Sequence, residues 1–132
     1  MKTISKLSTL AIALVVSFSS LSVQANPDKA LNKAKAAVEQ ASPDDWETYA
    51  NSAKTLIQKK AYMAEAKKWI ETSLSIKETA FNLEIMGDYY MKNKLPKKAM
   101  SYYIQSMNKL KEKDATVDTS NIQDKILKAK AM

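Results

Sequence analysis

The side chains of this chain with the clearest chemical potential are carboxylates that occur in pairs. Glu84 and Asp88 lie four positions apart, so a helix would place both on one face, whereas Asp44 and Asp45 are adjacent. Paired carboxylates can do acid–base chemistry or hold a cation weakly. Asp44 and Asp45, however, are better explained by the dipole of a helix that begins beside them. The sequence has no His and no Cys, so the usual imidazole base, thiolate nucleophile and zinc ligands are missing. We therefore expect no enzymatic activity, no metal and no cofactor.

Lysine supplies all of the positive charge, because the sequence contains no Arg. Arg is the usual side chain for bidentate recognition of phosphates and of DNA bases, so we expect no specific nucleic-acid partner. Lysines gather toward the end of the chain, where they motivate one hypothesis, binding to acidic envelope polymers or lipid headgroups. This group comprises Lys109, Lys111, Lys113, Lys125, Lys128 and Lys130.

Residues 1–25 have the pattern of a secretory signal peptide. Lys2 and Lys6 precede an apolar run over 7–16, and Val23 and Ala25 are small residues at the −3 and −1 positions of a cleavage site. The run is shorter than the roughly 20 residues that span a bilayer, which argues against a transmembrane anchor. We expect residues 26–132 to form one exported domain, periplasmic or secreted. It would carry 19 Lys against 14 Asp and Glu, a net charge of +5.

Helix start signals and apolar spacing predict an all-α fold. Asn26 and Ser42 each precede a proline at a first helical position, and Ser120 has a glutamine three residues on, so these three residues are the expected N-caps. Apolar residues then recur at helical spacing, and no stretch alternates as a strand would. The predicted helices cover 27–41, 43–60, 63–76, 78–93, 96–110 and 120–132, with a loop over 111–119.

A set of mostly small or apolar residues recurs at an interval of 33 positions. The later set is Leu83, Met86, Gly87, Tyr90, Ala99, Tyr103 and Ser106, and the earlier set is Ala50, Ala53, Lys54, Ile57, Ala66, Ile70 and Ser73. A fixed period of this length is typical of stacked helical hairpins, in which each unit buries its apolar face against a neighbour. Gly87, the only glycine, would lie inside a helix, where it is tolerated if another element approaches closely.

Residues 80–113 resemble a tetratricopeptide repeat, and residues 47–79 resemble one more weakly. Gly87, Tyr90 and Ala99 occupy the family's glycine, tyrosine and small-residue places. The earlier unit departs from the pattern with Lys54 at the glycine place, which puts close packing there in doubt. The resemblance implies a short array of antiparallel helical hairpins. The first helix and the C-terminal helix, over 120–132, would cap the two ends of this array with polar faces.

The resemblance also implies a concave groove, lined by the first helix of each repeat, that binds a protein or peptide. Its positions would be Phe81, Glu84, Asp88, Met91 and Lys92 in the later unit, and Thr48, Asn51, Thr55, Gln58 and Lys59 in the earlier one. Phe81 and Met91 lie off the buried stripe of their own helix, as groove residues would. Alternatively, the C-terminal helix or a partner subunit covers them. Glu84 and Asp88 would repel a carboxylate, so we expect no clamp for a peptide C-terminus.

The sequence thus predicts an exported adaptor that binds a protein or peptide in this groove. Two alternatives remain open: the lysine-rich binder of acidic polymers or lipid headgroups, and a homo-oligomeric structural element whose end faces associate.

Overall fold

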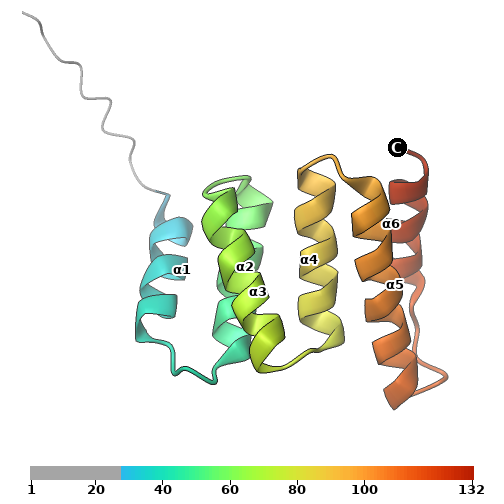
Figure 1. Ribbon diagram of the computed structural model, residues 1–132, viewed down its shortest axis with the longest axis horizontal. Helices are drawn as coiled ribbons and strands as arrows, with labels where there is room; N and C mark the ends of the chain where they lie inside the picture. Colours follow the sequence, from blue (N-terminus) through green and yellow to red (C-terminus); the bar gives the residue numbers. More distant parts are fainter. Residues whose placement is uncertain (1–27) are drawn as a thin grey trace, which may run out of the picture.

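A computed structural model describes residues 28–132, and within that range the chain forms six helices and no strand (Figure 1). The predicted signal peptide and the predicted cap Asn26 lie outside the described residues. The helices are α1 (Lys29–Gln40), α2 (Trp46–Lys59), α3 (Met63–Ile76), α4 (Ala80–Lys92), α5 (Pro96–Lys113) and α6 (Ser120–Lys130). None of them is long and apolar enough to cross a membrane.

Each helix packs on the next one along the chain, so the molecule is a row of helices that runs from α1 to α6 (Figure 1). The most extensive contacts lie within two hairpins, α2–α3 and α4–α5. A further contact joins α2 to α4, the first helices of the two hairpins. This packing confirms the predicted all-α class and is compatible with a helical repeat array.

The residues that recur every 33 positions are mostly buried, and one pair makes the same hydrogen bond in both hairpins. The Ser73 hydroxyl in α3 donates to the Trp46 carbonyl at the start of α2, over 2.7 Å. The Ser106 hydroxyl in α5 donates to the Ala80 carbonyl at the start of α4, also over 2.7 Å. Both serines are fully buried, so the hydroxyl of each satisfies a helix-end carbonyl away from water. The sequence period is therefore also a period in the structure.

The close approach predicted at Gly87 involves an aromatic ring. A Cβ atom at this position would lie 2.4 Å from Cε1 of Tyr103, so the ring of Tyr103 occupies the space that any other residue would need. Tyr103 itself is 2% exposed. The glycine is therefore required by the tyrosine that packs on it from α5.

Two predicted N-caps are wrong because neighbouring side chains bond the helix ends instead. Ser42 does not cap α2: that helix begins at Trp46, and the Asp45 carboxylate accepts from the Thr48 amide at 3.0 Å. Residues 43–44 form a turn before it. Ser120 is the first residue of α6 rather than its cap, and its amide donates to Asp118.

Other helix boundaries also differ from the prediction. Asp28 caps α1, which begins two residues later than expected and ends at Gln40. At α4, Thr79 and Asn82 form a reciprocal capping box, so this helix begins at Ala80 rather than at 78. The predicted loop over 111–119 is wrong at its start, because α5 continues to Lys113 through lysine and glutamate residues that favour helix.

Candidate functional site

The first helices of the two hairpins enclose a cleft of about 240 Å³ on the face where α2 and α4 meet. Its apolar residues are Ile57, Ile85 and Met91, of which the two isoleucines are buried and Met91 is partly exposed. Its polar residues are Lys54, Gln58, Asp88 and Lys92. We call this the α2–α4 cleft. It contains four of the predicted groove residues, Gln58, Asp88, Met91 and Lys92, together with three that the sequence analysis did not select.

Lys54 spans the junction between the two hairpins. Its ammonium nitrogen lies 5.3 Å from the ring centroid of Phe81, close enough for a cation–π contact with α4. The lysine at the glycine place of the earlier unit therefore reaches across to the next hairpin. Phe81 is only partly exposed and packs against the core that α1 to α4 share.

The carboxylate pair Glu84 and Asp88 is held by a lysine from the last helix. The Lys125 ammonium on α6 lies 2.7 Å from Oε1 of Glu84 and 2.8 Å from Oδ1 of Asp88. The hydroxyl of Tyr103 on α5 donates to the same Asp88 oxygen at 2.8 Å. Lys125 therefore occupies the place where a cation would bind, and its single positive charge offsets half of the charge of the two carboxylates that were expected to repel a peptide carboxylate.

The pKa values of two groups that bond Asp88, Lys125 and Tyr103, are shifted from their ordinary values. Burial alone lowers the pKa of Lys125, but hydrogen bonds to Asp88 and Glu84 outweigh it, so the net pKa is raised. Burial raises the pKa of the Tyr103 hydroxyl strongly, and the negative charge of Asp88 adds to the effect. Near neutral pH the lysine is charged and the tyrosine is neutral, which suits the hydrogen bonds that both make with Asp88.

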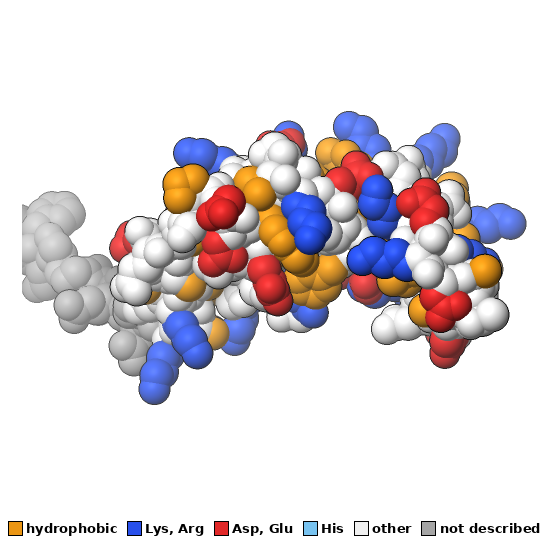
Figure 2. Space-filling view, turned by 90° about the horizontal axis from the view of Figure 1, so that it is seen from below, with side chains coloured by type: hydrophobic (Ala, Val, Ile, Leu, Met, Phe, Trp, Pro, Cys, Tyr) orange, Lys and Arg blue, Asp and Glu red, His pale blue; other side chains and the backbone are white. Residues whose placement is uncertain are grey.

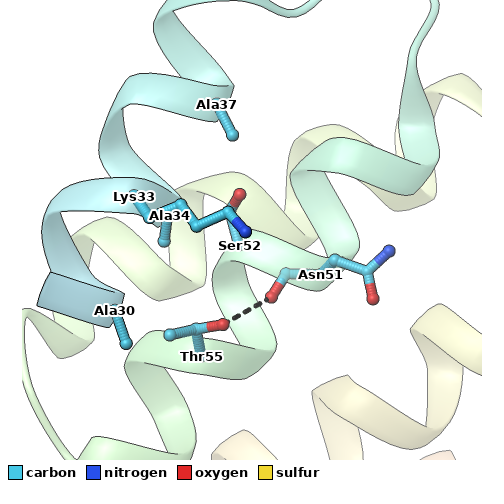
Figure 3. Close-up of a pocket in the computed structure, with 7 residues that line it drawn as sticks. All are labelled: Ala30, Lys33, Ala34, Ala37, Asn51, Ser52 and Thr55. Atoms are coloured by element: carbon cyan, nitrogen blue, oxygen red, sulfur yellow. Dashed lines mark hydrogen bonds between the residues drawn. The ribbon is translucent and has the colours of Figure 1, made fainter.

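Asn51 and Thr55, two further predicted groove residues, line a separate pocket between α1 and α2. This pocket has a volume of about 280 Å³, and its α1 wall consists of Ala30, Ala34, Ala37 and Lys33 (Figure 3). The Thr55 hydroxyl donates to the Asn51 carbonyl one turn earlier, so this hydroxyl is bonded within its own helix (Figure 3). The single groove predicted from the sequence is thus divided into two hollows, one on each side of α2.

The remaining predicted groove residues have contacts of their own. Lys59 pairs with Asp28 at 2.8 Å, which ties α2 to the start of α1. The Thr48 amide bonds the Asp45 cap. Met91 packs against a second core formed by α5 and α6, in which Ile122 of α6 is buried. This core includes residues of the C-terminal helix, and the covering of Met91 by that helix or by a partner subunit stays a prediction.

Two of the six lysines near the end of the chain are paired with carboxylates. Lys109 pairs with Glu78, and Lys125 pairs with Glu84 and Asp88. Among the carboxylates of residues 28–132, none pairs with Lys111, Lys113, Lys128 or Lys130. The face in Figure 2 carries acidic and basic side chains interspersed along its length rather than a patch of one sign.

Comparisons of this chain with protein-family models, curated proteins and solved structures return no match. Its function must therefore be inferred from its own residues.

A third hollow, of about 500 Å³, lies between α5 and α6 at the end of the row. Its lining is largely apolar and consists of Ile104, Met107, Lys111, Gln123, Ile126 and Leu127. We call it the α5–α6 groove. On α5, Ile104 is 39% exposed. On α6, Leu127 is 61% exposed, so the polar end face predicted for the last helix is wrong at this position. The signal for this groove was present in the sequence, because Leu127 is an apolar residue outside the buried stripe of its helix.

Proposed function

We propose that this protein is an exported, non-catalytic adaptor of the helical-repeat type, which binds a protein or peptide segment in the α2–α4 cleft. The observation that supports the proposal best is the lining of the cleft, in which an apolar floor is bordered by Lys54, Gln58 and Lys92. Such a site accepts an apolar side chain and offers polar partners to the peptide backbone beside it.

The size of the cleft favours a peptide side chain over a free small molecule. At about 240 Å³ it is smaller than the roughly 300–1,000 Å³ of typical small-molecule pockets. It also lies where two hairpins meet, so a bound segment would contact both of them. The internal pairing of Asp88 with Lys125 leaves Lys54 and Lys92 as the cleft's charged groups without a carboxylate partner in residues 28–132.

The test is photo-cross-linking in the native envelope, with a reactive residue at position 91 in the cleft. The matched control carries the same residue at Lys68, which is exposed on α3. A discrete adduct from position 91 that is absent from position 68 supports the adaptor and gives the partner's mass. An absence of adducts, or equal smears from both positions, contradicts it.

The competing hypothesis of binding to acidic polymers or lipid headgroups rests on Lys111, Lys113, Lys128 and Lys130, which have no carboxylate partner in the described residues. Electrostatic binding of this kind should weaken steeply as salt rises. Retention of the protein on anionic vesicles, measured at low and high ionic strength, separates it from cleft binding. Retention that does not change with salt contradicts the electrostatic hypothesis.

A further inference from the structure

The α5–α6 groove lies where the structure would place another helix. Thr79 and Thr119 occupy the N-cap positions of α4 and α6, so positions counted from these residues can be compared. Ile126 and Leu127 then correspond to Met86 and Gly87. In α4 both residues are buried: Met86 is 1% exposed, and the ring of Tyr103 from α5 lies on Gly87. In α6 the corresponding Leu127 is 61% exposed.

The same comparison explains the opposite face of α6. Lys125 corresponds to Ile85, which packs toward the preceding hairpins. Lys125 likewise points back, to Glu84 and Asp88 on α4. The helix α6 therefore has the orientation of a first helix in a hairpin, and the groove marks the place of a second helix that residues 28–132 do not supply.

The charges of α5 and α6 restrict what can occupy this place. The helix α5 carries five lysines and one glutamate, and α6 carries three lysines and one aspartate. Lys109 is paired with Glu78, just before α4, and Lys125 with Glu84 and Asp88 on α4, so the six other lysines of the two helices outnumber Glu112 and Asp124. One lysine, Lys111, lines the groove itself.

We propose that the α5–α6 groove binds an amphipathic helix of another protein, with apolar residues on one face and Asp or Glu along its margins. The apolar floor takes the apolar stripe of that helix, and the lysines face its acidic margins. A second copy of this chain fits poorly, because two such grooves would bring like charges together. The helix α1 at the other end of the row also carries three lysines against one glutamate. The groove is distinct from the α2–α4 cleft, so the two proposals can fail separately.

The probes are two synthetic peptides of about the 18-residue length of α5. Both have leucines at i, i+3, i+4 and i+7 on one face. One has glutamates along the margins and the other has lysines at the same positions. Binding of each labelled peptide to the chain comprising residues 26–132 is measured by fluorescence anisotropy. We expect the glutamate peptide to bind and the lysine peptide to bind on the order of tenfold more weakly or not at all.

Two substitutions locate the binding. Leu127→Glu places a charge on the groove floor at an already exposed position, and it should weaken binding of the glutamate peptide on the order of tenfold. The matched control is Leu95→Glu, which changes a leucine that is 44% exposed at the turn between α4 and α5. That control should bind the peptide as the unsubstituted protein does. Circular dichroism of both variants checks that the helices are intact.

Several results would overturn the proposal. One is equal binding of both peptides, or no binding of either at millimolar concentration. Another is equal loss in the Leu127→Glu and Leu95→Glu variants. A dimer in analytical ultracentrifugation that Leu127→Glu dissociates would assign the groove to a second copy. Binding to phosphatidylglycerol vesicles that Leu127→Glu abolishes, without peptide binding, would assign it to a membrane surface.

Discussion

The hairpins α2–α3 and α4–α5 share a backbone arrangement but differ in what fills it. In both, a buried serine donates to the carbonyl at the start of the first helix. In α4–α5 the ring of Tyr103 lies on Gly87, and its hydroxyl bonds Asp88, which also binds Lys125 of α6. The corresponding positions in α2–α3 hold Ile70 and Lys54. The α2–α3 hairpin therefore has an aliphatic side chain, Ile70, at this position. In the α4–α5 hairpin, a buried tyrosine bonds a carboxylate that pairs with a lysine of α6.

The largest difference should appear when the glycine of the second hairpin is replaced. Gly87→Val would place side-chain atoms where Cε1 of Tyr103 lies, and we expect the free energy of unfolding to fall by about 3 kcal/mol. At the corresponding position of the first hairpin, Lys54→Val should cost less than about 1 kcal/mol. Urea unfolding followed by circular dichroism measures both. Equal losses would mean that the two hairpins do not differ in close packing.

Replacing the two buried serines should lower the free energy of unfolding by different amounts, because Ser73 has one more hydrogen-bond partner than Ser106. Its hydroxyl donates to the Trp46 carbonyl and accepts from the Asn82 side-chain amide at 3.0 Å, whereas Ser106 has one recorded bond. We expect Ser73→Ala to lower the free energy of unfolding by about 2 kcal/mol and Ser106→Ala by about 1 kcal/mol. The same urea titrations test this order, and a larger loss from Ser106→Ala would contradict it.

Alkaline pH should weaken the second hairpin selectively. Burial raises the folded-state pKa of Tyr103 above that of the unfolded chain, so its contribution is complete below pH 10 and is lost as pH rises further. At one pH unit above the ordinary tyrosine pKa of about 10, the loss from this group is about 1.4 kcal/mol. The raised pKa of Lys125 acts in the same direction.

The measurement is the difference in unfolding free energy between pH 8 and pH 11. In the Tyr103→Phe variant that difference should be smaller by about 1.4 kcal/mol, although its stability at pH 8 is lower. The comparison variant is Tyr102→Phe: burial also raises the pKa of Tyr102, but less strongly, so this variant should change the pH dependence in the same direction by less. A pH dependence unchanged by Tyr103→Phe would show that the tyrosine hydroxyl is not buried against Asp88.

The smallest expected change in the free energy of unfolding comes from glycine substitutions in the turns, and it should be the same in both hairpins. Lys60 and Lys94, in the turns that follow α2 and α4, have positive φ angles of 51° and 61°. This left-handed conformation favours glycine, so Lys60→Gly and Lys94→Gly should each raise the free energy of unfolding by about 0.5 kcal/mol. Thermal unfolding of the two variants checks whether the turns are equivalent. A gain in only one of them would mean that the turns differ.

Much of the fold could be predicted from the sequence, because helix signals are local. Apolar spacing located all six helices, and the 33-residue period identified the buried serines and Gly87. The N-caps at α2 and α6 were predicted wrongly because several nearby side chains compete for the same backbone amides. The two units were predicted to share one groove, but their residues line two hollows, one between α1 and α2 and one between α2 and α4.

The candidate site was predicted less completely than the fold. Gln58, Asp88, Met91 and Lys92 do lie in one cleft, but Asn51 and Thr55 line a different pocket. Lys54 was noted only as an irregularity of the repeat, yet it bridges α2 to Phe81 on α4. The peptide groove itself and its partner stay predictions.

The sequence by itself determined where the six helices lie to within about three residues and most of the face that each one buries, because helix signals and apolar spacing depend on neighbours three or four positions away. Only the tertiary structure decided that Lys125 pairs with Asp88, which lies 37 positions earlier, and that Leu127 is left exposed. Contacts of this kind depend on how whole helices are placed against one another. The charge and apolarity of a side chain follow from the sequence, but the side chains that it contacts depend on how the helices pack.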